Sequence, residues 1–86
     1  MEMDLPTRKW SLDAAIEHGP NRTRAQIVLR APDGQEFSGV GLALRTAPEQ
    51  VASYLALGRA LSDLTEELVE AATAELDAEA GRTQHT

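Results

Sequence analysis

The chain has 86 residues, of which 42% are apolar and 26% charged, with eight basic against fourteen acidic side chains and no cysteine. This length accommodates one domain with a thin core, and the lack of cysteine excludes disulfides, cysteine zinc sites and thiol chemistry. The acidic start lacks the pattern of a signal peptide, and no stretch approaches the ~20 apolar residues that cross a bilayer. We therefore expect one cytoplasmic domain over residues 1–86, with an ordered core over about 8–80 and short loose tails.

The first half of the chain alternates apolar and polar residues with the period of two that is typical of half-buried strands. Such segments cover residues 10–17, 22–30 and about 35–45. A turn is predicted between the first two, around Gly19 and Pro20, and the Asp33-Gly34 pair is typical of a tight turn between the second and third. These features predict a three-stranded antiparallel β-meander.

The second half predicts one long helix. Thr46 and Glu49 have the spacing of a capping box, so the helix is expected from Ala47 to about Glu79, and Gly81 is a plausible stop. Its predicted apolar stripe comprises Val51, Leu55, Leu57, Leu61, Leu64, Leu68, Ala72 and Leu76. A continuous helix of this length spans about 50 Å, whereas a ten-residue strand spans about 33 Å. Either the helix breaks near Gly58, or one end projects beyond the sheet and needs another partner.

The fold class is therefore α+β, with three strands packed on a C-terminal helix in the order β-β-β-α. Gly39 and Gly41 lie on one face of the third strand, where missing side chains let a helix approach the sheet closely. The residues expected to face the helix are Trp10, Leu12, Ile16, Ile27, Leu29, Phe37, Gly39, Gly41 and Ala43. On the helix we expect Leu61, Leu64 and Leu68 to be buried.

Several short segments occur in a characteristic order, namely Trp10, Glu17, Thr23-Arg24-Ala25, Gly39-Val40-Gly41-Leu42-Ala43 and Arg59-Ala60-Leu61-Ser62-Asp63-Leu64. This set resembles a family of small uncharacterised actinobacterial proteins whose fold is similar to the double-stranded-RNA-binding domain. The resemblance covers roughly Lys9 to Ala80 and implies a β-β-β-α arrangement with no established activity. The sequence departs from the family at Ala52-Ser53-Tyr54, where a glycine and acidic residues are expected. It departs again at Leu42 and Leu44, which are polar or basic in the family.

Nothing in the sequence predicts an enzyme. His18 lies in a turn and His85 in the terminal tail, no carboxylates gather at metal-ligand spacing, and no serine has a base that the sequence identifies. We expect no catalytic residue, no metal site and no cofactor.

The second strand carries Arg22, Arg24 and Arg30 on one face. They permit two interpretations: a contact surface for RNA or DNA, or solvated arginines that pair with Asp13 and Glu17 across the strands. Residues 46–86 hold two basic against eight acidic side chains, and they account for the whole formal charge of −6. Because the isoelectric point is near 4.7, nucleic acid is the disfavoured partner.

Strict alternation leaves Val28, Val40, Leu42 and Leu44 on the sheet face opposite the helix. Such a patch is typical of an association surface, and it predicts a homodimer. A β-bulge around Gly39 that turns these residues inward is the competing interpretation. The favoured function is a non-enzymatic domain that self-associates and acts through protein–protein interaction. The alternative is a weak RNA- or DNA-binding protein that uses the three arginines.

Overall fold

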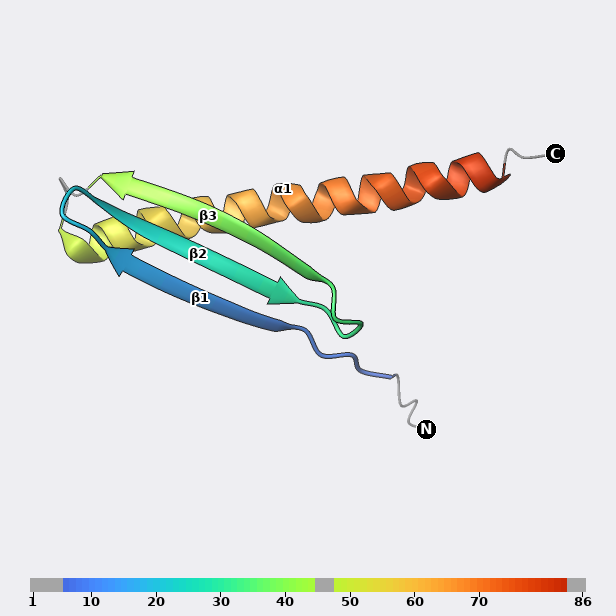
Figure 1. Cartoon of the computed structure of the whole chain (residues 1–86), viewed down its shortest axis with the longest axis horizontal. Coiled ribbons are helices and arrows are strands. Elements are labelled where there is room, and N and C mark those ends of the chain that lie inside the picture. Colours follow the sequence, from blue (N-terminus) through green and yellow to red (C-terminus); the bar gives the residue numbers. More distant parts are fainter. Residues whose placement is uncertain (1–5, 45–47, 84–86) are drawn as a thin grey trace, which may run out of the picture.

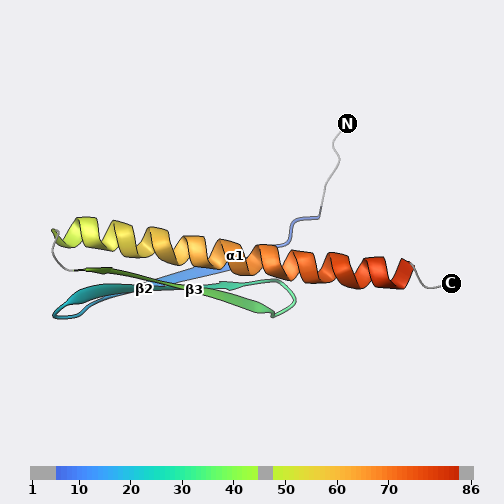
Figure 2. The ribbon, with the colours of Figure 1, turned by 90° about the horizontal axis from the view of Figure 1, so that it is seen from above.

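The computed structural model describes residues 6–44 and 48–83. Three strands, β1 (Ser11–His18), β2 (Arg22–Arg30) and β3 (Glu36–Leu44), precede one helix, α1 (Glu49–Thr83). The sheet order is β1-β2-β3 and both pairs are antiparallel, so the predicted meander is confirmed. Figure 2 shows α1 lying along one face of the sheet as a second layer. The α+β class and the β-β-β-α order are therefore confirmed.

Both predicted turns close through backbone hydrogen bonds. In the first, the Gly19 amide donates to the Arg22 carbonyl at 2.9 Å. In the second, the Gly34 amide donates to the Ala31 carbonyl at 3.0 Å, and Gly34 has a φ of 92°. A left-handed φ of this kind is accessible to glycine without steric cost, so this residue sets the direction of the β2–β3 turn.

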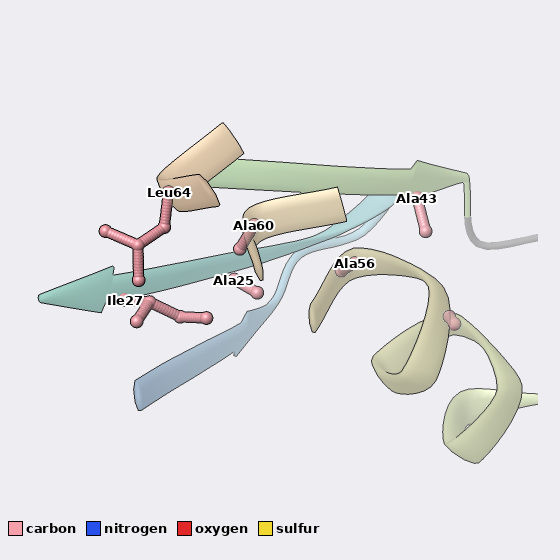
Figure 3. Close-up of a cluster of buried hydrophobic side chains, with 7 residues drawn as sticks. Ala25, Ile27, Ala43, Ala56, Ala60 and Leu64 are labelled. Atoms are coloured by element: carbon pink, nitrogen blue, oxygen red, sulfur yellow. The ribbon is translucent and has the colours of Figure 1, made fainter. Parts of the chain in front are cut away.

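The two glycines of β3 determine how closely α1 approaches. A Cβ atom at Gly39 would overlap the carbonyl oxygen of Ala60, and one at Gly41 would overlap that of Ala56. The helix backbone therefore rests almost directly on the strand, and only small helix side chains fit between them. The buried core is accordingly rich in alanine and consists of Ala25, Ile27, Ala43, Ala52, Ala56, Ala60 and Leu64 (Figure 3).

This close approach corrects the predicted helix face. Leu64 is buried as expected and Leu68 is half-buried, but Leu61 is 42% exposed. Val51, Leu55 and Leu76 are exposed as well. Part of the predicted stripe does face the sheet, since Leu57 and Leu68 pack against the core beside Leu64. The contact is nonetheless centred on the alanines, because a glycine-bearing strand selects the helix face with the smallest side chains.

The helix is continuous. It does not break at Gly58, and it passes Gly81 to end at Thr83, slightly later than predicted. At its start the Ala52 amide donates to the Pro48 carbonyl at 3.0 Å, while the predicted cap at Thr46 lies outside the described residues. The C-terminal end of α1 extends beyond the sheet, as Figures 1 and 2 show. None of the described helical sequence is long and apolar enough to span a membrane.

The helix covers β3 and β2 but not β1. Every residue of β1 is exposed, including Leu12 at 52% and Ile16 at 37%, and Trp10 just before the strand is 52% exposed. Leu12 and Ile16 lie on the helix side of the sheet as predicted, but α1 does not cover them. Strands lie about 4.8 Å apart and a helix is about 10 Å wide, so one helix centred on the glycines of β3 covers only about two strands.

Candidate functional site

The predicted self-association patch lies on the sheet face away from α1. The residues of β2 and β3 pair one to one from Arg22↔Leu44 to Arg30↔Glu36, so the competing bulge at Gly39 is excluded. On this outer face each apolar residue lies opposite a polar one in the register: the pairs are Arg22↔Leu44, Arg24↔Leu42, Gln26↔Val40 and Val28↔Ser38. Val40, Leu42 and Leu44 are 37%, 40% and 70% exposed, so these residues stay accessible beside the arginine and glutamine side chains. Because each apolar residue has a polar cross-strand neighbour, the patch is a narrow column along β3, with Val28 on the neighbouring β2, rather than a wide apolar surface.

Two of the three arginines on this face are engaged with carboxylates. The Arg30 Nε donates to Glu36 Oε2 at 2.8 Å, and this hydrogen bond together with the Glu36 charge raises the pKa of Arg30. Arg24 Nη1 lies 3.9 Å from Glu17 Oε1. Cross-strand pairing of this kind is what the solvated interpretation predicted, although Arg30 pairs with Glu36 rather than with Asp13. Paired arginines hold less free positive charge for a phosphate backbone.

The described residues offer no obvious chemistry. No three potential metal ligands gather among them, and His85 lies outside the described residues. His18 Nδ1 lies 3.2 Å from Thr23 Oγ1, and its Nε2 lies 3.5 Å from Glu49 Oε2, which ties the end of β1 to the start of α1. One open hollow of about 250 Å³ lies beside Trp10 and Phe37. That volume is below the range of about 300–1,000 Å³ that small-molecule sites occupy.

The outer edge of β3 is closed by the helix. Three side chains of α1, each four residues from the next, bind backbone groups of the strand. Glu67 accepts from the Ser38 amide at 2.7 Å, Asp63 accepts from the Val40 amide at 3.0 Å, and Arg59 donates to the Leu42 carbonyl at 2.6 Å. Carboxylates meet N–H groups and a guanidinium meets a carbonyl, so each contact is charge-assisted. These three backbone groups are therefore not free to pair with a further strand, which protects this edge.

The outer edge of β1 has no such cover among the described residues. The Gly19–Arg22 hydrogen bond sets the alternation of the β1–β2 ladder, in which hydrogen-bonded and non-hydrogen-bonded pairs follow each other. By this alternation the backbone N–H and C=O groups of Leu12, Ala14 and Ile16 point away from β2. Their side chains lie on the helix side of the sheet, opposite Leu29, Ile27 and Ala25. An unpaired edge and an uncovered apolar face therefore coincide on one strand.

Comparison with known proteins now supplies a family. A family model described as Rv2632c-like matches residues 8–85. The chain belongs to the Rv2632c-like family. Among solved structures, the "Crystal Structure of Rv2632c" is similar, with 32% sequence identity and a TM-score of 0.78 over 90% of this chain and 95% of that chain. No curated protein matches the chain.

The resemblance expected from the sequence is thus confirmed at the level of family and fold. Because the likeness to Rv2632c spans 90% of this chain, it includes most of the sheet and most of the long helix. The Rv2632c-like family carries no assigned activity, so function has to be argued from the surfaces of the molecule.

Sequence reasoning missed the hydrogen bonds that close the β3 edge in this Rv2632c-like chain. The available signal was the spacing of Arg59, Asp63 and Glu67, which places three charged side chains on one side of a helix. That spacing is also typical of an ordinary solvated helix face. Only the position of α1 above the glycines of β3 brings these three side chains within hydrogen-bond distance of the strand backbone, where they cover its outer edge.

Proposed function

We propose that this chain is a non-enzymatic interaction domain that acts as a homodimer. The proposal rests on one observation, the apolar helix-side surface of β1 that α1 leaves uncovered. Trp10, Leu12 and Ile16 are each more than one-third exposed, and no charged residue interrupts the helix-side positions from residue 10 to residue 16. Contiguous apolar surface of this kind on a small protein marks an association site.

A second copy of the chain is the partner that the proposal favours. Symmetric dimers are the commonest way in which a small domain covers such a surface, since one patch then buries its own copy. The outer-face column of Val28, Val40, Leu42 and Leu44 stays a second predicted surface for self-association or for another protein. No observation favours the nucleic-acid alternative, because two of its three arginines are paired with carboxylates.

Size-exclusion chromatography with light scattering tests the dimer. At micromolar concentration we expect a mass twice that of the 9.3 kDa chain. A mass of one chain at all accessible concentrations would contradict the proposal. A mobility-shift titration with duplex RNA at two salt concentrations tests the alternative, because phosphate binding weakens steeply as salt rises. A salt-sensitive shift together with a monomeric mass would favour a nucleic-acid-binding protein.

A further inference from the structure

We infer that the open edge of β1 pairs antiparallel with β1 of a second copy, with Ala14 on the two-fold axis. This inference rests on the proposed homodimer and specifies its interface. The two sheets would join into one sheet of six strands, in the order β3-β2-β1-β1-β2-β3. Each helix would remain over its own β3, at the two outer margins of the joined sheet.

The backbone of β1 supplies the hydrogen bonds for this pairing. The sheet has two edges, and the β3 edge is already occupied by side chains of α1 at Ser38, Val40 and Leu42. The β1 edge presents the unpaired backbone groups of Leu12 and Ile16 on either side of Ala14. An exposed edge of this length is a template for another strand, and natural proteins either protect such edges or use them.

The charges of β1 discriminate between registers. Asp13 and Glu17 lie on the outer face of the strand, and like charges directly opposite each other destabilise a pair of strands. An axis at Asp13 would oppose the two Asp13 carboxylates. An axis at Ala15 would oppose Asp13 to Glu17. An axis at Ala14 opposes no acidic residue to another.

The register centred on Ala14 also makes the longest favourable pairing. It places Leu12 opposite Ile16 of the second copy on the helix side, twice by symmetry. On the outer face it places Asp13 opposite Ala15 of the second copy, which is a small neutral neighbour. An axis at Ile16 likewise avoids opposed acids, but the pairing then leaves Leu12 without a cross-strand partner. Leu12 and Ile16, which α1 leaves exposed, are thus brought together by the Ala14 register.

Substitutions on β1 test the edge. Ala14→Pro removes an amide that points away from β2, a position at which an edge strand tolerates proline, and we expect it to convert the dimer into a folded monomer. Leu42→Lys, on the outer face, is the matched control and should leave the dimer intact. Circular dichroism of both variants verifies that the monomer remains folded.

Charge changes at Ala15 test the register. Ala15→Lys places an ammonium group opposite Asp13 of the second copy, twice per dimer, and we expect the dimer dissociation constant to fall about three- to tenfold. Ala15→Glu should raise the constant by a similar factor. If both variants change it in the same direction, the Ala14 register is wrong.

Amide hydrogen exchange of the unmodified protein gives a readout that needs no substitution. The amides of Leu12, Ala14 and Ile16 should become protected as protein concentration rises through the dissociation constant.

A monomeric mass for the unmodified chain would overturn both the homodimer and this interface. A dimer that survives Ala14→Pro, with these three amides still exchanging rapidly, would overturn the β1 interface alone. If Leu42→Lys then dissociates that dimer, the outer-face column is the interface.

Discussion

β1 and β3 are the two edges of one sheet, run parallel to each other and have nearly equal length, yet α1 makes them different. Over β3 the helix lies close enough for Arg59, Asp63 and Glu67 to bind the strand backbone. Over β1 it leaves apolar side chains and backbone groups exposed. The glycines at 39 and 41 are the cause, because a Cβ atom at either position would overlap a carbonyl oxygen of the helix backbone. A close contact at one edge thus leaves the other edge available for association.

The largest effect is expected from a substitution that prevents the close contact between α1 and β3, which is the cause of the difference between the two edges. In Gly41→Val a branched side chain would overlap the Ala56 carbonyl and push α1 away from β3. We expect a loss of more than about 3 kcal/mol in the free energy of unfolding, measured by denaturant titration, since overpacking against backbone has no cheap relaxation.

Gly58→Ala is the matched control for this substitution. Nothing lies within 4 Å of an added Cβ at Gly58, and alanine favours the helix interior, so we expect a gain of about 0.5–1 kcal/mol. A melting temperature for Gly41→Val equal to that of the unmodified protein would show that the helix does not rest on β3 through this glycine.

The next effect concerns Leu64, the large aliphatic side chain that is most deeply buried among the described residues of α1. Leu64→Ala should cost about 2–5 kcal/mol, because Leu64 is 5% exposed and its truncation leaves a cavity above the sheet. Leu61→Ala, on the exposed side of the same helix, should cost less than about 1 kcal/mol. Equal losses for the two variants in denaturant titrations would contradict the alanine-rich contact face.

The smallest effect is expected from the loss of one of the three hydrogen bonds by which α1 side chains cover the β3 edge. From the sequence alone, Glu67 lies on a solvated face and its replacement is nearly neutral. The hydrogen bond to the Ser38 amide changes this expectation: Glu67→Ala should cost about 0.5–1.5 kcal/mol relative to Glu66→Ala. Glu66 is the matched control because it has the same helix propensity and no such bond to β3. Faster amide exchange at Ser38 in Glu67→Ala alone would locate the effect at this edge, and identical stability of the two variants would contradict the stabilising role of this hydrogen bond.

The local sequence pattern was sufficient to predict the secondary-structure elements of this fold. The period of two identifies three strands, and the turn chemistry at Gly34 makes them an antiparallel meander. The helical period after Pro48 identifies α1, and the spacing of Gly39 and Gly41 predicts the close approach that the structure confirms. These inferences succeed because each depends on residues that are neighbours in the chain.

The tertiary structure decided which strands the helix covers and which of its faces touches them. Alanine and leucine stripes run side by side along α1, and the sequence favours the leucines because they bury more apolar area. The choice of the stripe of Ala52, Ala56 and Ala60 follows from where α1 crosses the sheet, and so does the exposure of Leu12 and Ile16. That crossing is set by contacts between residues far apart in the chain, Gly39 with Ala60, 21 positions later, and Gly41 with Ala56, 15 positions later. The glycine spacing within β3 predicts that a helix comes close, but periodicity within a single element does not specify which residues of α1 lie over those glycines.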